Sequence, residues 1–250
     1  MNLFKCILGK NPCFVAGENI KPIGIMVHST GANNPMLRRY VQPMVGYADY
    51  DELMEKLGDN PNNNDWNNTN RQVCVHAFVG KLADGSVASV QTLPWDMRGW
   101  HSGKGKKGSA NDTHISFEIC EDNLKDPVYF AAVYKEAVEL TAHLCELYGL
   151  DPMEDGVVIC HSEGYQRGIA NNHGDVMHWF PKHGKSMDTF RADVSALLVK
   201  PDDGSEWSKE ARTWAVDTGL IVGTGNGYEW KRPVTREEMV TILHRYSKMK

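Results

Sequence analysis

The sequence lacks several features that would mark a protein of a specialised class. No apolar run approaches the length of a membrane span, and the stretch at residues 1–10 is too short in apolar residues for a secretory signal. Neither charge dominates, because 27 Lys+Arg stand against 32 Asp+Glu, a net charge of −5. We therefore expect no nucleic-acid partner and no membrane partner.

Closely spaced pairs of cysteines are also missing from the sequence. The six cysteines are scattered without C-x-x-C spacing, which argues against a structural zinc held by four thiolates. Cys74, Cys120 and Cys160 lie within apolar, strand-like runs. This pattern predicts reduced, buried thiols in a protein made in a cytosol.

The order of apolar patterns predicts one α/β domain followed by a small helical module. With 250 residues the chain can bury a full core. A helix is expected from Asp126-Pro127 to Gly149, with an aspartate N-cap, proline in the first turn and glycine at the end. The predicted strands are 23–28, 72–80, 86–92, 114–120 and 157–161, and the other predicted helices are 35–57 and one near 187–199. This alternation favours a central mixed β-sheet flanked by helices over residues 1–200, with a linker at 201–206 and a module at 207–250.

Two histidines stand where apolar runs end. His28 follows the run at 23–27, and His161 follows the run at 157–160. In open α/β folds the ends of the strands form the rim where ligands bind. The loop after His161 carries His173, Asp175 and His178. Two strand-end histidines and one loop residue can supply the three protein ligands of a catalytic zinc, with water as the fourth.

Glu118 lies in the middle of an otherwise apolar strand. Alternation places it with Ser116 on the face opposite Ile115 and Phe117. A carboxylate there is costly unless it has a partner or a chemical role. It is either an edge-strand residue that faces water, or the general base for a zinc-bound water.

Four motifs in a fixed order then resemble a known family. They are His28-Ser29-Thr30, Trp100-His101-Ser102-Gly103, Asn111-Asp112 followed by Ile115-Ser116-Phe117-Glu118, and Cys160-His161-Ser162-Glu163. Over roughly residues 20–200 the chain resembles the zinc-dependent N-acetylmuramoyl-L-alanine amidases, the type 2 family of phage endolysins and peptidoglycan recognition proteins. The resemblance implies one Zn²⁺ and hydrolysis of the amide between N-acetylmuramic acid and L-alanine. It predicts a phage or prophage endolysin or a bacterial autolysin; the alternatives are a peptidoglycan-binding protein without activity and a zinc peptidase of the stem peptide.

The resemblance assigns the site residue by residue. His28 and His161 match the two histidine ligands, and Glu118 matches the glutamate that handles the catalytic proton. The third ligand has three candidates, because the Pro-Gly that usually follows it in the family is missing here. We favour Asp175, which puts His173 where other members carry a lysine that stabilises the oxyanion. His173 and His178 remain alternatives as ligands.

The same resemblance predicts a substrate groove and a place of action. It puts Trp100, His101 and Asn111 at the groove, although His101 could serve only loop packing. We expect synthesis in the cytoplasm without a signal peptide, and action on the Gram-positive cell wall after release or holin-type export.

The C-terminal module has its own resemblance. The stretches 207–216, 219–225 and 233–238 are similar to one S-layer homology repeat, a helix–loop–helix unit. Thr235 is the expected N-cap of the second helix, and Glu238 would complete a capping box. Such repeats bind secondary cell-wall polymers, usually three at a time. One copy implies assembly of several chains, a dimerisation or packing element, or a hairpin with no ligand.

Overall fold

The computed structural model describes residues 1–198, 204–223 and 227–249. Contacts divide the chain into two compact units, Met1–Leu198 and Val199–Lys250. Residue 199 of the expected helix, residues 201–203 of the expected linker and residues 224–225 of the C-terminal motif lie outside the described residues. No helix within the described ranges has the length and apolar character needed to cross a membrane.

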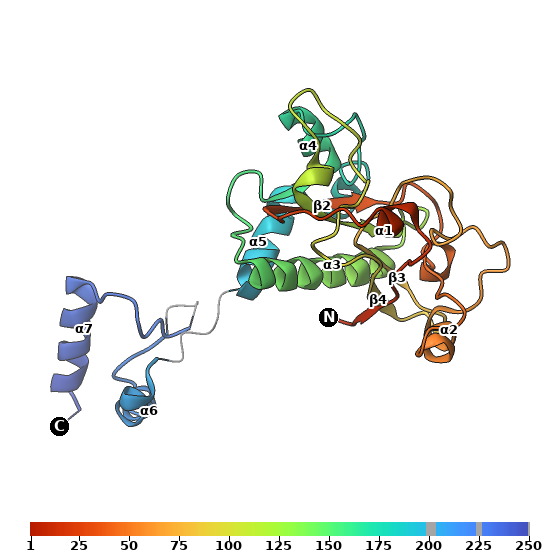
Figure 1. Cartoon of the computed structure of the whole chain (residues 1–250). Coiled ribbons are helices and arrows are strands. Elements are labelled where there is room, and N and C mark those ends of the chain that lie inside the picture. The colour runs from red at the N-terminus through yellow and green to blue at the C-terminus, as the bar shows by residue number, and fades with distance from the viewer. Residues whose placement is uncertain (199–203, 224–226, 250) are drawn as a thin grey trace. The chain divides into compact units, whose positions relative to one another are not determined.

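The first unit is built on a six-stranded sheet with the strand order β1-β4-β3-β5-β2-β6 (Figure 1). Only β3 and β4 pair antiparallel, so the sheet is mixed, as the sequence predicted. The strands are β1 (Leu3–Lys5), β2 (Gly24–Ser29), β3 (Ala77–Lys81), β4 (Val87–Gln91), β5 (His114–Ile119) and β6 (Val158–Cys160). The α-helices are α1 (Pro12–Ala16), α2 (Tyr50–Leu57), α3 (Pro127–Tyr148), α4 (His161–Arg167) and α5 (Met187–Leu198), with 3-10 turns at Leu37–Arg39, Ala110–Asp112 and Phe180–His183.

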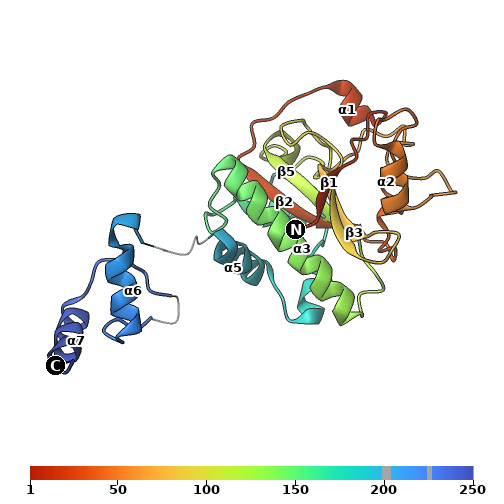
Figure 2. The same ribbon diagram turned by 90° about the horizontal axis from the view of Figure 1, so that it is seen from below.

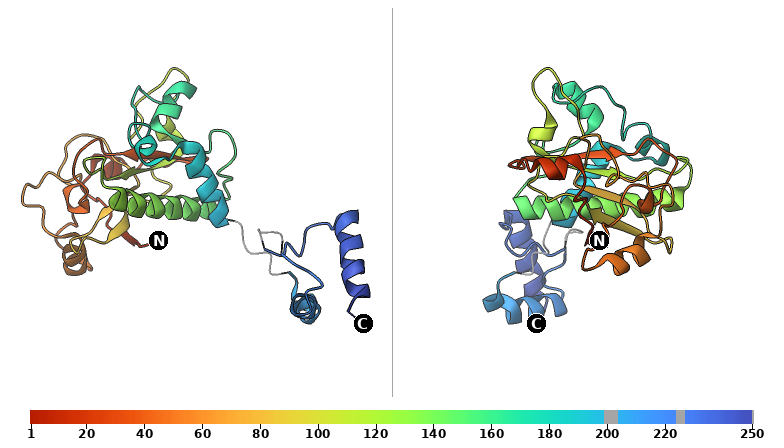
Figure 3. Two further views of the ribbon diagram at one scale, coloured as in Figure 1. Left: turned by 180° about the vertical axis from the view of Figure 1, so that it is seen from behind. Right: turned by 45° about the vertical axis from the view of Figure 1, so that its right-hand side comes forward.

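One face of the sheet carries the main core. Ile25 of β2 and Ile115 and Phe117 of β5 belong to one buried cluster with the apolar stripe of α3. The helices α3 and α5 pack side by side over this face (Figures 2 and 3). The helix α4 lies on the opposite side of the sheet (Figure 1). Residues of β2 and β5 that alternate with this core therefore face the α4 side.

Local sequence fixes the ends of α3. The Asp126 carboxylate accepts hydrogen bonds from the backbone N–H of Val128 and Tyr129, at 2.9 and 3.1 Å. Gly149 ends the helix in the left-handed region, with φ of 65°, a conformation that costs glycine little. Both ends agree with the prediction.

Two predicted elements were too long. Instead of a helix over 35–57 there is a single 3-10 turn and then α2, because Pro43 lacks a backbone donor and Gly46 adopts a φ of 96°. The predicted strand 72–80 begins only at Ala77. Before it, Cys74 forms an isolated antiparallel bridge with Trp100, so this segment pairs with a loop instead of the sheet.

The second unit contains α6 (Lys209–Asp217) and α7 (Arg236–Ser247). Thr235 caps α7, and the Glu238 side chain accepts from the Thr235 N–H, which is the predicted capping box. In the first unit all six cysteines are unpaired and buried, as expected of reduced thiols.

Candidate active site

The register of β2 and β5 brings His28 beside Glu118. The two strands run parallel, and these two residues are direct partners in the pairing. Both project from the face opposite α3, because they alternate with core residues on their strands. The His28 ring is almost fully buried, with 1% of its side chain exposed.

His161 reaches the same place from the next strand. It is the first residue of α4 and not the last residue of β6, because the observed strand is Val158–Cys160, one residue shorter at each end than the predicted 157–161. The Glu163 side chain accepts from the backbone N–H of Cys160 at 3.0 Å and pairs with Arg191 at 3.1 Å. This capping anchors the first turn of α4 and thereby fixes the His161 backbone.

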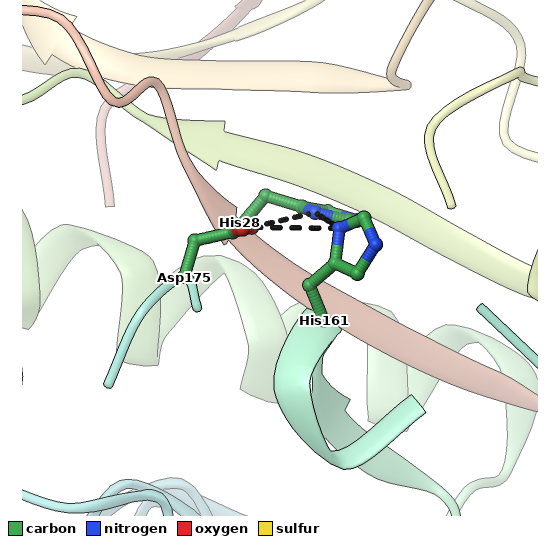
Figure 4. Close-up of side chains that lie close together, drawn as sticks. All are labelled: His28, His161 and Asp175. Carbon is green, nitrogen blue, oxygen red and sulfur yellow. Dashed lines mark hydrogen bonds and ion pairs between the residues drawn. The ribbon is translucent and has the colours of Figure 1, made fainter. Parts of the chain in front are cut away.

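Asp175 completes a cluster with the two histidines (Figure 4). Its Oδ2 atom lies 3.0 Å from His28 Nδ1 and 3.7 Å from His161 Nδ1. The two Nδ1 atoms are 3.1 Å apart. One nitrogen from each ring and one carboxylate oxygen therefore converge on a single point.

The other two candidates for a third ligand lie differently. His173 stacks on His161 with 4.7 Å between ring centroids, and its Nδ1 lies 4.0 Å from Asp175 Oδ1. Its side chain is 57% exposed, beside the cluster and not within it. His178 lines the cavity beside the cluster but is not one of its three residues, and its Nε2 lies 2.8 Å from Glu121 Oε1.

The remaining ring nitrogens of the two histidines have partners of their own. His161 Nε2 lies 2.9 Å from Asn171 Oδ1, and because an amide oxygen only accepts, this nitrogen carries the proton. His161 Nδ1 therefore presents a lone pair to the cluster. His28 Nε2 lies 3.0 Å from His101 Nδ1. A histidine that ligates a metal through one ring nitrogen usually donates a hydrogen bond from the other ring nitrogen to an acceptor. The role of Asn171 was not predicted, since nothing in the sequence distinguishes it from the neighbouring asparagine.

These residues fit a zinc ion. Two atoms bound at about 2.0–2.2 Å to a tetrahedral zinc lie roughly 3.3 Å apart, and the three distances in the cluster, 3.0, 3.1 and 3.7 Å, bracket that value. Two imidazoles and a carboxylate are a known donor set for zinc with an open fourth position. A lone pair and a carboxylate that face one another also call for a cation between them.

Glu118 is held in a state that favours a proton. Its Oε2 atom is buried and has no hydrogen-bond partner among the described residues. Burial raises the pKa of the Glu118 carboxyl well above its usual value, and the nearby charges of Asp175 and Glu121 raise it further. A carboxylate with one buried oxygen that has no partner, beside a cluster of metal-ligand type, has the character of a general base or acid.

A cavity of about 580 Å³ opens onto the cluster. Trp100 and His101, the two residues predicted at a substrate groove, line it. Trp66 and Val73 line it as well and were not predicted. Asn111 requires a correction, because its side chain has no exposed surface. Its Oδ1 accepts from the backbone N–H of His101 and Ser102 and its Nδ2 donates to Gly103 O, so it shapes the loop and does not reach a ligand.

The family model of N-acetylmuramoyl-L-alanine amidase matches residues 18–178, which contain every residue of this site. The chain belongs to this amidase family. It is thus an enzyme, a peptidoglycan amidase, with the mixed α/β fold described above.

Two solved structures with TM-scores of at least 0.50 share the fold of the amidase. The Staphylococcus aureus hydrolase AmiA, determined in complex with its ligand, is 19% identical with a TM-score of 0.53, over 80% of this chain and 84% of that one. The PlyG catalytic domain, a solution structure, is 20% identical with a TM-score of 0.50, over 82% of this chain and all of that one. A mutant endolysin from Bacillus subtilis is 22% identical with a TM-score of 0.48, over 78% of this chain and 99% of that one. No curated protein sequence matches the amidase.

Proposed function

We propose that this amidase hydrolyses the bond between N-acetylmuramic acid and L-alanine with one zinc ion held by His28, His161 and Asp175. The observation that supports this proposal most directly is the convergence of the two Nδ1 atoms and Asp175 Oδ2 within 4.8 Å of one another. When bound, zinc polarises the lactyl amide carbonyl and lowers the pKa of its water to about 7.

The protein's own groups handle the protons. Glu118, paired with His28 across β2 and β5, accepts a proton from the attacking water. It then returns a proton to the departing nitrogen of L-alanine, since the amine is a poor leaving group unless it is protonated. His173 donates a hydrogen bond from its ring to the oxyanion. Its stacking on His161 keeps it beside the cluster.

Metal removal tests this proposal. Chelation should abolish hydrolysis of purified cell walls, and one equivalent of zinc per chain should restore it. The metal content of the active protein, measured by atomic emission, should be one zinc. Full activity of thoroughly metal-free protein would overturn the metalloenzyme mechanism.

We also propose that the C-terminal module retains the enzyme on the cell wall. Its helix α7 has no buried residue, and Met239, Val240, Leu243 and Tyr246 are each about half exposed or more. An amphipathic helix normally buries such a stripe, so a partner for it is expected. Pairing of chains through α7 or binding of a secondary cell-wall polymer would supply one. The enzyme would then act on the Gram-positive wall after release or export, as a phage endolysin or an autolysin.

Removal of residues after Lys200 tests the module. The truncated protein should cleave soluble muropeptide at an unchanged rate and bind intact walls more weakly, because tethering raises the effective substrate concentration. If chains pair through the module, sedimentation should show that truncation converts an oligomer into a monomer. Loss of activity on the soluble fragment would mean that the module is part of the catalytic fold.

A further inference from the structure

A second cavity of about 670 Å³ adjoins the active site and is strongly basic. Lys104, Lys106 and Lys107 line one side, and Tyr165 and Arg167 of α4 line the other. The mechanism proposed above uses none of these residues. The glycine-rich loop 103–109 that carries the three lysines therefore lacks an assigned role.

The loop is held in a defined place. Lys107 N–H donates to Gly168 O at 2.7 Å, and Ala110 N–H donates to Ile169 O at 2.8 Å. A turn within the loop is closed by Gly105 N–H, which donates to Gly108 O at 2.8 Å. A β-carbon at Gly105 would collide with the backbone of Gly168. The close approach of the two segments thus requires glycine there and fixes the backbone on which the lysines stand.

The three lysines are exposed and their charges are not neutralised. None of them forms an ion pair with any residue in the described part of the chain, and all three are exposed. Arg167 is different, because the Asp155 carboxylate binds it at 2.5 and 2.9 Å. Three free cations within four residues form a local positive site on a chain whose net charge is −5. Such a site favours an anionic ligand.

The basic cavity continues the catalytic one. Asn171 lines both cavities, and its Oδ1 accepts the proton of His161 Nε2 at 2.9 Å. Gly103 lines the catalytic cavity, and the next residue, Lys104, lines the basic one. A ligand that extends from the reaction centre past Asn171 would enter among the lysines.

The chemistry of the substrate decides which part of it could lie there. The lactyl carboxyl group of muramic acid is consumed in the scissile amide, so the glycan beside that bond carries no ionised group. The ionised carboxylates are on the peptide side. Trp66 and Trp100 line the catalytic cavity and not the basic one, and they offer aromatic surface of the kind that packs against sugar rings.

On this basis we infer that Lys104, Lys106 and Lys107 bind carboxylates of the stem peptide and make the enzyme selective for an anionic peptide arm. The inference rests on the proposed amidase reaction and adds the polarity of substrate binding to it. The glycan lies toward Trp66 and Trp100, and the peptide lies toward the loop 103–109.

A pair of soluble muropeptides tests the inference. One carries free carboxylates on the stem peptide, and the other carries carboxamides at the same positions. The full-length zinc enzyme should hydrolyse the carboxylate form with the lower KM. The K104Q/K106Q/K107Q variant should raise that KM by roughly 1.5- to 5-fold per lysine, the range of exposed ion pairs, and leave kcat and the carboxamide KM unchanged. The preference should weaken as salt is added.

A charge-matched variant is the control. K5Q/K21Q/K135Q removes the same charge from exposed positions that line neither cavity. It should keep the preference for the carboxylate substrate, which separates local binding from a change in net charge. Zinc content and thermal unfolding of both variants should equal those of the wild type.

The other outcomes are distinct. Equal hydrolysis of both muropeptides by the wild type would overturn the inference and leave the amidase reaction intact, whereas no hydrolysis of either would contradict the reaction itself. If the loop variant loses only its binding to walls that carry phosphate polymers, with unchanged muropeptide kinetics, the lysines bind phosphate and the inference is wrong.

Discussion

His101 Nδ1 lies 3.0 Å from His28 Nε2, on the side of the His28 ring away from the metal cluster. The pKa of His101 is lowered well below its usual value by burial and by the neighbouring histidines, so this ring is neutral. The neutral His101 Nδ1 can accept a hydrogen bond from the His28 Nε2–H group. The His28 proton then stays on Nε2, and the lone pair is on the Nδ1 atom that faces Asp175. His101 therefore positions the His28 ring and also lines the cavity.

Changing His101→Phe should weaken zinc binding by about 10- to 100-fold, as is usual when the partner of a metal-ligating histidine is lost. His101→Asn keeps an acceptor group and should recover part of the affinity. Competition with a chelating dye would measure both. Equal zinc affinity of wild type and His101→Phe would show that the contact does not orient His28.

Changing Glu118→Gln keeps the shape of the side chain and removes its basicity. Turnover should fall by roughly 10²- to 10⁴-fold while zinc content stays at one per chain. The metal-free variant should also be more stable than metal-free wild type at neutral pH, because it no longer buries a carboxyl whose pKa is raised. Unchanged turnover would return Glu118 to a structural role.

The identity of the third ligand can be settled with three alanine variants. Asp175→Ala should lose zinc, because the Asp175 oxygen is the one that meets both Nδ1 atoms. His173→Ala should retain zinc and lower kcat. His178→Ala, the matched control, should do neither, since its ring is bound to Glu121. Metal analysis and single-turnover rates would measure these effects, and zinc loss in His173→Ala with retention in Asp175→Ala would reverse the assignment.

The fold was largely predictable because its signals are local. Alternation in β5, the Asp126 cap and Gly149 each act within a few residues, and the structure has them where the sequence places them. The predicted helix over 35–57 was wrong because Pro43 and Gly46 interrupt it. The contact partners of the site were harder to predict. Asn171 and Trp66 lie on loops that bring them to the site. The sequence of a loop has no periodic pattern from which its course could be predicted.

Acid should destabilise the metal-free protein between about pH 6.5 and pH 4. Burial lowers the pKa of His76 and of His161 from 6.5 to about 4, and it lowers that of His114 as well. As the pH falls, these histidines take up protons at a higher pH in the unfolded state than in the folded state. The free energy of unfolding therefore falls as the pH falls through this window. For the fully buried His76 alone the loss is about 3 kcal/mol. Glu118, with its raised pKa, acts in the opposite direction.

Urea denaturation in chelator at several pH values would measure this dependence. His76→Gln should give a flatter profile than the wild type between pH 6.5 and 4. A free energy of unfolding that stays constant across this range would contradict the assignment of neutral, buried histidines.

The chemical identity of the new termini that the enzyme creates in peptidoglycan tests the proposed amide hydrolysis most directly. Purified cell walls would be digested with the zinc-loaded protein, and the new termini would be identified by amine labelling and mass spectrometry. We predict free amino groups on L-alanine and free lactyl carboxyl groups on muramic acid, in equal amounts, and roughly 10²- to 10⁴-fold slower formation of both by Glu118→Gln. New amino groups on another residue of the stem peptide, or new reducing ends in the glycan, would contradict it.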